Sequence, residues 1–514
     1  MMDRVEEKKM NRHFTRRGIL GVALGGAAVA LLAACGQTAA PTAAPASSSG
    51  GAASATTAPA SSGGSQPAAT SASKPAAAAP STGSAPAEIV FWPRSPSESQ
   101  VVWEKIIPIQ QKMFPELKVN LQAPPDDFNG KFLVAFAGGT APDSGVTGLM
   151  SFRSYIGKKM LKTIQPYVNS DDAVKKMLQE DYVPSATAGY STKGELYATP
   201  TVSEAVVLFY HRDAVDQAGL PQPRDIDDDK SKWNWDTFVD YAKKLNKGTG
   251  FRRERFGAIV TYARDTNGLS QAWGNLCYAR GARFLDPEGE NWIFTGKEAE
   301  ESIQYIVDLI YKHDVHPDVG EAASANVLDR AFFQNGQVGM VVEGEYFSRY
   351  LWGSGKPSGG IPFKYDIAQM PFNPVTGKRT NIYHGNGSFL TTQSKNPDAT
   401  WKWLRVIFEK DAQQVITNLW GTRAAHKGTY DSWLKTNGNG GPEGINVQAI
   451  VKADADTYPF PTTPYLTPQA LLEPTMRVMY DNVFQNKQKV ADGLAQIEKE
   501  TKALLEKGKA ELPK

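Results

Sequence analysis

Short apolar runs alternate with amphipathic segments from residue 88 to the end of the chain. Residues 89–92 (IVFW) are an apolar run that Pro93 ends, and residues 117–121 alternate apolar and polar side chains as a half-buried strand does. Both patterns predict β-strands. The same reasoning predicts further strands at residues 205–210, 256–261, 337–342 and 388–391.

Helices are marked by 3.6-residue spacing and by capping residues. Thr295 and Glu298 have the spacing of a capping box, and Asn396 followed by Pro397 is typical of a helix N-terminus. Helical spacing also predicts helices at residues 235–245 and 494–505. Strands that alternate with helices indicate parallel α/β sheets. The 427 residues after position 87 are too many for one such sheet, so we expect two α/β lobes.

The N-terminus has the pattern of a bacterial export signal. Arg16 and Arg17 precede a weakly apolar run at residues 18–34, which ends in Leu32-Ala33-Ala34 before Cys35. We expect residues 1–34 to be a lipoprotein signal peptide, with Cys35 as the acylated first residue. The paired arginines favour the twin-arginine route, and general secretion remains the alternative.

Residues 35–87 are predicted to be a disordered tether. Between positions 36 and 86 the sequence is Ala, Ser, Pro, Thr and Gly with one charge, Lys74, and no apolar side chain larger than Ala. Such a segment cannot bury enough surface to offset its ordering entropy. Lipid on Cys35 would then hold the protein at the outer face of the cytoplasmic membrane.

Composition excludes several classes of protein. The net charge of +2 comes from the signal peptide, and the remainder carries −1, so nucleic-acid binding is not expected. Two cysteines, Cys35 and Cys277, cannot make a disulfide scaffold, and we expect Cys277 to be a small buried side chain in a helix. No later segment is apolar enough to cross a bilayer, so the membrane contact would be the lipid anchor only.

Metal and cofactor signals are weak. His313 and His316 have the spacing of a ligand pair without a third ligand nearby. The acidic run at residues 225–229 has Lys230 where a calcium loop needs Gly, so a solvated loop is favoured. Nucleotide-binding glycine loops and a Gly-x-Ser-x-Gly elbow are absent from the sequence. We therefore expect no cofactor and no metal.

Aromatic side chains are the positive signal. All 11 tryptophans lie after residue 87. Most must pack in a core, and some could stack on the apolar faces of sugars. Composition alone supports a carbohydrate site only modestly.

Four segments together resemble family 1 of the extracellular solute-binding proteins, the sugar receptors of ATP-driven importers. They are residues 131–143 (KFLVAFAGGTAPD), 194–213 (GELYATP followed by LFYHRD), 331–340 (AFFQNGQVGM) and 387–400 (GSF followed by SKNPDAT). Their order and spacing fit the family across nearly all of residues 88–514. The sequence departs from the family's pattern at His211-Arg212, at a longer acidic link after Leu220, and at Glu345-Tyr346.

The resemblance implies a type II periplasmic-binding-protein fold, in which two α/β lobes are joined by a hinge and enclose a ligand cleft. The first lobe would be residues 88–200 with 386–430, and the second 203–383 with 431–514. It further implies a monomer without catalytic activity that captures a sugar or oligosaccharide. The ligand would pass to the permease and ATPase subunits of an ABC transporter.

Five expected ligand-binding residues lie in the N-terminal segment of the first lobe. Trp92, Arg94 and Ser95 follow the first strand, at the end of an α/β sheet where ligands bind. Trp92 could equally be a core residue. Thr147 and Ser151 lie in a second region that contacts ligand in the family. The tryptophan and aspartate of maltose receptors are missing there, which points to a different or smaller sugar.

The other five follow from the matched motifs. Glu204 corresponds to a sugar-binding carboxylate, Tyr346 to a stacking aromatic ring, and Arg423 to a basic residue facing the ligand. Trp273 lies on a helix near other family contacts, and Asn386 lies between two glycines at the second crossing. For Trp273 core packing, and for Arg423 a surface salt bridge, are the alternatives.

Two other functions stay open. One is a secreted enzyme that modifies polysaccharide, which would need two carboxylates flanking one sugar bond. The other is a receptor for a non-sugar ligand such as a glycerol-phosphate ester, a polyamine or a peptide.

Overall fold

The computed structural model describes residues 87–124, 127–261, 269–324, 329–352, 357–420, 422–440 and 444–513. The predicted signal peptide, Cys35 and all but the last residue of the predicted tether lie outside these residues. Residues 80–514 belong to one compact unit. None of the described helices has both the length and the apolar content needed to cross a bilayer.

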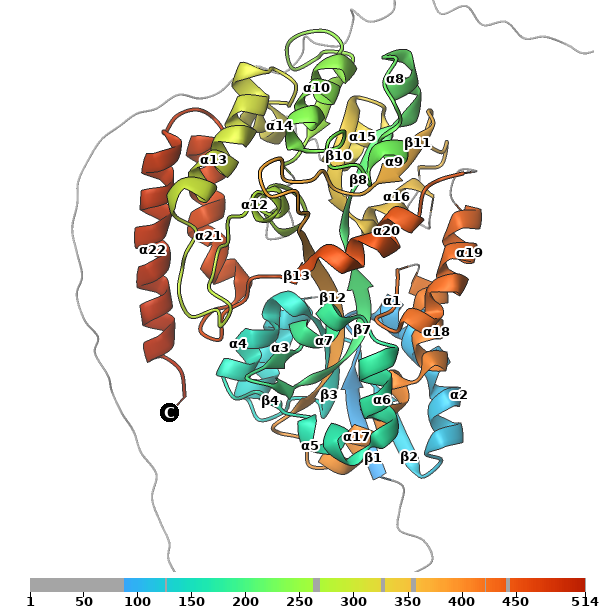
Figure 1. Cartoon of the computed structure of the whole chain (residues 1–514). Helices are drawn as coiled ribbons and strands as arrows, with labels where there is room; N and C mark the ends of the chain where they lie inside the picture. Colours follow the sequence, from blue (N-terminus) through green and yellow to red (C-terminus); the bar gives the residue numbers. More distant parts are fainter. Residues whose placement is uncertain are drawn as a thin grey trace, which may run out of the picture. The chain divides into compact units, whose positions relative to one another are not determined.

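Two β-sheets organise the described part of the chain (Figure 1). The larger sheet has seven strands, with order β13-β12-β3-β1-β2 and with β4 and β7 also paired to β12. Its strands are β1 (Ala87–Trp92), β2 (Leu117–Leu121), β3 (Ser144–Gly148), β4 (Leu161–Lys162), β7 (Ala198–Glu204), β12 (Asn381–Thr391) and β13 (Thr457–Pro459). The smaller sheet has order β11-β8-β10-β9. Its strands are β8 (Val206–His211), β9 (Phe256–Ile259), β10 (Val338–Gly344) and β11 (Tyr365–Ala368).

Helices cover both sheets. Against the larger sheet pack α4 (Leu149–Gly157), α7 (Pro184–Gly189) and α17 (Pro397–Phe408). Against the smaller sheet pack α10 (Trp235–Leu245), α15 (Asp329–Gln334) and α20 (Gln448–Lys452). At the C-terminus α21 (Pro468–Val478) packs on α22 (Val490–Ala510), which also contacts α13 (Gly296–Val307). The result is the expected type II periplasmic-binding-protein architecture with two α/β lobes.

The prediction of parallel sheets was only partly right. Strand β1 pairs in parallel with β2 and β3, whereas β12 runs antiparallel to β3, β4 and β7. In the smaller sheet β8 is antiparallel to both neighbours. The antiparallel pairs arise because the chain crosses between the sheets and returns, which local periodicity does not reveal.

Most predicted elements are present with shifted ends. Helix α10 has the predicted bounds, and the 494–505 segment lies within α22. Cys277 is buried in helix α12 (Gly274–Ala279), as predicted. The capping box at Thr295 does not form: Thr295 is the N-cap residue of α13 but makes no side-chain capping hydrogen bond.

Two polar motifs have structural roles. His316 is buried, with Nδ1 2.8 Å from the carbonyl oxygen of Pro317 and Nε2 3.3 Å from Oγ1 of Thr261. The prediction that the acidic run is solvated was right for the exposed Asp225 and Asp228 and wrong for Asp227. Asp227 is buried and accepts a hydrogen bond from the backbone of Gln369, because this segment packs beside β11.

The crossing between the sheets is held by a buried ion pair. Only Ala205 separates β7 in one sheet from β8 in the other. A carboxylate oxygen of Glu345 accepts a hydrogen bond from the backbone N–H of Ala205, and the backbone N–H of Glu345 donates to the carbonyl of Ala205. Arg423 donates to Glu345 at 2.7 Å and to Asp454 at 2.5 Å. Burial opposes the charge of Arg423, yet the two carboxylates raise its pKa well above the ordinary value.

Removing Arg423 should therefore destabilise the protein strongly. We expect Arg423→Met to lower the free energy of unfolding by about 3–5 kcal/mol, because two carboxylates lose their buried partner. Urea unfolding followed by tryptophan fluorescence measures this change. The exposed Arg252 is the matched control, and Arg252→Met should change stability by less than about 0.5 kcal/mol.

A double variant separates the ion pair from simple loss of packing. Arg423→Met with Glu345→Gln should lose less than the sum of the two single losses, because one uncompensated carboxylate is gone. Strictly additive losses, or a loss below 1 kcal/mol for Arg423→Met, would contradict this account of the crossing.

Candidate functional site

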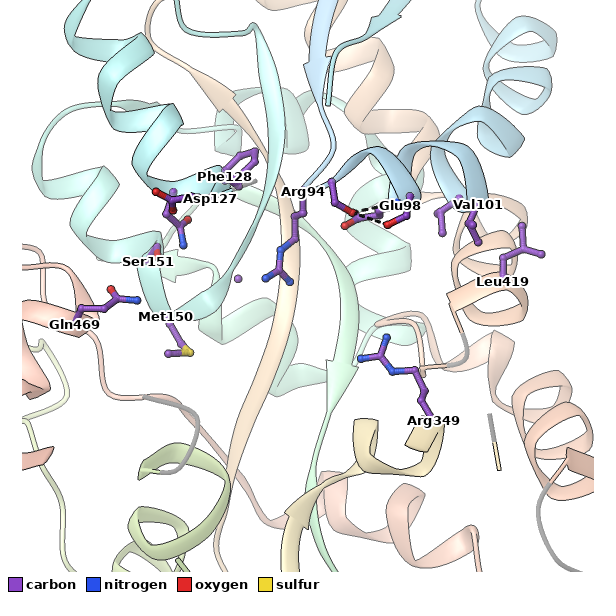
Figure 2. A pocket seen from close by; sticks show the side chains of 15 residues that line it. Arg94, Glu98, Val101, Asp127, Phe128, Met150, Ser151, Arg349, Leu419 and Gln469 are labelled. Atoms are coloured by element: carbon purple, nitrogen blue, oxygen red, sulfur yellow. Dashed lines mark hydrogen bonds between the residues drawn. The ribbon is translucent and has the colours of Figure 1, made fainter. Parts of the chain in front are cut away.

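A cavity of about 720 Å³ lies beside the carboxyl ends of β1 and β3 (Figure 2). The first part of the chain supplies most of its lining, from the loop after β1, the start of α3 (Phe128–Ala137) and the start of α4. Arg349 on α16 (Ser348–Leu351), which follows β10 of the smaller sheet, and Gln469 on α21 also line it. The full lining is Arg94, Ser95, Ser97, Glu98, Val101, Val102, Asp127, Phe128, Asn129, Gly148, Met150, Ser151, Arg349, Leu419 and Gln469.

Arg94 reaches into the cavity from the loop that Pro93 starts after β1. Its Nη1 donates a 3.0 Å hydrogen bond to Oδ1 of Asn386, which lies on β12. The pairing of β12 with β7 shifts register between Asn386 and Gly387. A side chain at Gly387 would come within 2.8 Å of the ring of Tyr190, so only glycine fits here. The structure thus joins two residues that the sequence placed 292 positions apart.

Ser95 and Ser151 also line the cavity. Ser95 Oγ accepts a hydrogen bond from the backbone N–H of Glu98 and so caps the short helix α1 (Pro96–Glu98). Thr147 lies behind the lining and is almost fully buried. Its Oγ1 donates to Oδ1 of Asn129 at 3.3 Å, and Asn129 is the residue that faces the cavity.

Glu204 ends β7, directly before the crossing residue Ala205. Its half-buried carboxylate makes no side-chain hydrogen bond or ion pair within the described part of the chain. Burial raises its pKa, and the nearby charges of Arg349, Arg94 and Arg423 lower it to a smaller extent. Glu204 is not among the residues that line the cavity, but it lies within electrostatic reach of both arginines that do.

Two predicted aromatic residues lie away from the cavity. Trp273 is fully buried and packs edge-to-face on Phe284 and Phe484, as its core alternative required. Trp92 is half-buried and packs edge-to-face on Phe128, which does line the cavity. Trp92 itself borders a neighbouring hollow on the other side of α3.

Tyr346 and Arg423 are engaged inside the protein. The hydroxyl of Tyr346 donates to Glu343 at 2.5 Å and accepts from Arg330 at 2.7 Å. Arg423 is fully buried in the ion pair with Glu345 and Asp454, so it is neither a surface salt bridge nor part of the cavity lining.

Several lining residues were not predicted from the sequence. Asp127 could have been found, because an aspartate before an apolar helix is a typical N-cap, and its side chain does accept from the backbone N–H of Gly130. Glu98, Asn129, Met150, Gln469 and Arg349 carry no sequence signal that singles them out. Among the described residues no three His, Cys, Asp or Glu side chains are grouped so that they could hold a metal ion.

Comparison with curated proteins gives distant relatives that are named for binding. An arabinooligosaccharide-binding protein of Halalkalibacterium halodurans is 22% identical over 351 residues, covering 67% of this chain and 72% of the relative. The sn-glycerol-3-phosphate-binding periplasmic protein of Salmonella typhimurium is 24% identical over 323 residues, covering 58% of this chain and 67% of the relative.

Solved structures share the fold. The sugar-binding protein MalE from Xanthomonas citri aligns with a TM-score of 0.67 at 19% identity, covering 82% of this chain and 98% of that one. An ABC substrate-binding protein of Listeria monocytogenes in complex with cycloalternan aligns with a TM-score of 0.63 at 18% identity, covering 82% of this chain and 99% of that one. The family described as bacterial extracellular solute-binding protein matches residues 95–414. The chain belongs to this family.

Proposed function

We propose that this protein is the lipid-anchored, extracytoplasmic binding component of an ABC importer. As a monomer it captures a sugar or oligosaccharide between its two lobes and delivers it to the permease. The observation that carries the proposal is the cavity lined from both lobes, by Arg94 and Ser151 on one side and by Arg349 and Gln469 on the other. A ligand there contacts both lobes and can stabilise one relative position of them.

The groups at the cavity suit a hydroxyl-bearing ligand. Arg94, Arg349 and Gln469 are donors in the lining. Glu204 does not line the cavity, but its carboxylate lies within electrostatic reach of both arginines and is an acceptor without an internal partner in the described part of the chain. A partly enclosed site makes each such bond selective, because an unmatched polar group costs free energy. The relatives named for arabinooligosaccharides support a carbohydrate ligand, and the relative named for glycerol 3-phosphate keeps a phosphate ester as the second candidate.

The first test is a thermal-shift panel on the purified full chain in non-ionic detergent. The panel holds arabino-oligosaccharides, maltose, mannitol, glycerol 3-phosphate and a polyamine, with chromatography of the sugars after incubation. We expect a carbohydrate to raise stability by roughly 2.7 kcal/mol at a hundredfold excess over its Kd. Stabilisation by the polyamine alone would contradict the sugar assignment, and release of shortened sugars would contradict a receptor.

The second test concerns Glu204. Glu204→Gln should weaken binding of the panel's best sugar about ten- to a hundredfold, because an ionised acceptor is replaced by a neutral one. Since burial raises the pKa of Glu204, the affinity of the unaltered protein should fall as pH drops through that raised pKa, and the variant should lack this dependence. Isothermal titration calorimetry at several pH values measures both effects.

The exposed Glu300 on α13 is the control for that experiment. Glu300→Gln should leave affinity and its pH profile unchanged. Equal affinity of the Glu204 variant and the control would show that Glu204 does not contact ligand.

The third test concerns the membrane anchor. We expect Cys35→Ala to abolish incorporation of labelled palmitate and to move the exported protein from the membrane fraction to the soluble fraction, because acyl chains supply the attachment. Replacement of Arg16 and Arg17 by lysine should block export on the twin-arginine route only. Membrane retention of the Cys35 variant would contradict the lipoprotein assignment.

A further inference from the structure

We infer that the ligand carries an acidic group, held between Arg94 and Arg349. The ligand class is then an acidic sugar, either a uronate or a sugar phosphate, rather than a neutral oligosaccharide. This inference rests on the proposed function and narrows it.

The two guanidinium groups enter the same cavity from different lobes. Figure 2 shows Arg94 pointing into the cavity from the loop after β1 and Arg349 pointing toward it from α16 on the opposite side. An anionic group between them can accept hydrogen bonds from both, and planar guanidinium groups match carboxylate and phosphate geometry.

Arg349 lacks the carboxylate partner that several half-buried arginines of this protein have. Arg280 shares this lack in the described part of the chain, but its guanidinium group lies over the ring of Tyr305 and does not line the cavity. Arg224 and Arg405 each have a carboxylate oxygen at 2.7 Å. Arg349 makes no hydrogen bond or ion pair in the part of the chain that the structure describes, and its Nε is sealed from solvent without a partner. A guanidinium group in such a place is strongly stabilised when an anion supplies the missing acceptors.

Arg94 likewise lacks a carboxylate partner. Its hydrogen bond goes to the neutral amide oxygen of Asn386, and it forms no ion pair within the described residues. The two cavity arginines thus share an absence of carboxylate partners, although they come from segments 255 residues apart in the chain.

None of the nearby carboxylates forms an ion pair with Arg94 or Arg349 in the described part of the chain. Glu98 is buried and accepts a 2.8 Å hydrogen bond from Nε1 of Trp103, and burial raises its pKa despite Arg94. Asp127 lines the cavity and caps α3 through the backbone N–H of Gly130. Glu204 does not line the cavity, although both guanidinium groups lie within electrostatic reach of its carboxylate.

A neutral ligand would leave both guanidinium groups without an ionic partner. Hydroxyl groups can accept hydrogen bonds from arginine but bring no charge. A ligand with one negative charge can accept charge-assisted hydrogen bonds from both Arg94 and Arg349. The same carboxylate, Glu204, can then accept from the remaining hydroxyl groups.

The experiment compares matched neutral and acidic ligands on the full chain. The pairs are glucose with glucuronate, glucose with glucose 6-phosphate, and neutral galacto-oligosaccharides with oligogalacturonates, each measured by titration calorimetry at 50 and 300 mM NaCl. We expect one acidic member to bind at least about tenfold more tightly than its neutral partner, which corresponds to 1.4 kcal/mol, with the preference shrinking at the higher salt concentration. The uronate and phosphate pairs distinguish the two sources of charge.

Variants of Arg349 and Arg94 test whether these arginines cause the preference for acidic ligands. Arg349→Gln should weaken binding of the acidic ligand much more than binding of its neutral partner, and so remove most of the preference, without moving the unfolding midpoint. Arg252→Gln on the surface should alter neither the affinities nor the midpoint. Arg94→Gln should act in the same direction as Arg349→Gln.

The outcomes separate this inference from the proposed function. Equal or tighter binding of the neutral members, or an acidic preference that survives Arg349→Gln, would overturn the inference while leaving a sugar receptor intact. Failure of every carbohydrate in both classes to bind would contradict the proposed function itself.

Discussion

The buried ion pair between Arg423 and Glu345 is the interaction on which the site depends. Glu345 bonds the backbone of Ala205, the residue at which the chain passes from one sheet to the other, and the carbonyl of Arg423 accepts from the backbone N–H of Ser203. The backbone on both sides of Glu204 is therefore fixed by the same pair. A carboxylate at that point is positioned without any hydrogen bond of its own in the described part of the chain.

The second crossing strand completes the frame. β12 pairs with β7 and with β3, so the loops that follow β1 and β3 are held at one edge of the larger sheet. Asn386 on β12 then lies where its amide oxygen can receive Arg94. Because these contacts join segments hundreds of residues apart, a disturbance in one crossing strand would change the position of site residues on several loops at once.

Local patterns in the sequence predict where helices and strands lie, but they do not predict which strands pair with each other or in which direction. Continuous apolar runs locate β1 and β8, alternation of apolar and polar side chains locates β2, and helical spacing locates α10 and α22. The antiparallel return of β12 leaves no such signal. The Thr295 capping box failed for a related reason, since its spacing permits a hydrogen bond that the folded backbone does not make.

Side-chain roles were harder to predict than positions. Of the residues expected to bind ligand, Arg94, Ser95 and Ser151 line the cavity, because the ends of strands β1 and β3 are fixed by the fold. The resemblance to the family could not separate Trp273 from the core, since an aromatic side chain on a helix has the same local pattern in both places. No local pattern in the sequence marked Arg349, because its role follows from its position opposite Arg94 in the cavity of the folded protein.

Arg423 and Arg349 show how one residue type serves two purposes in the same region. Arg423 is fully buried and has two carboxylates within 2.7 Å, so its charge stabilises the crossing strands. Arg349 lies only four residues beyond Glu345 but makes no ion pair or hydrogen bond in the described part of the chain, and it lines the cavity. A charged side chain that is paired inside the protein helps to hold the backbone in place. A charged side chain without an internal partner can bind ligand, because the ligand then supplies its hydrogen-bond or ion-pair partner. Arg423 therefore supports the site from inside the protein, whereas Arg349 belongs to the surface that would contact the ligand.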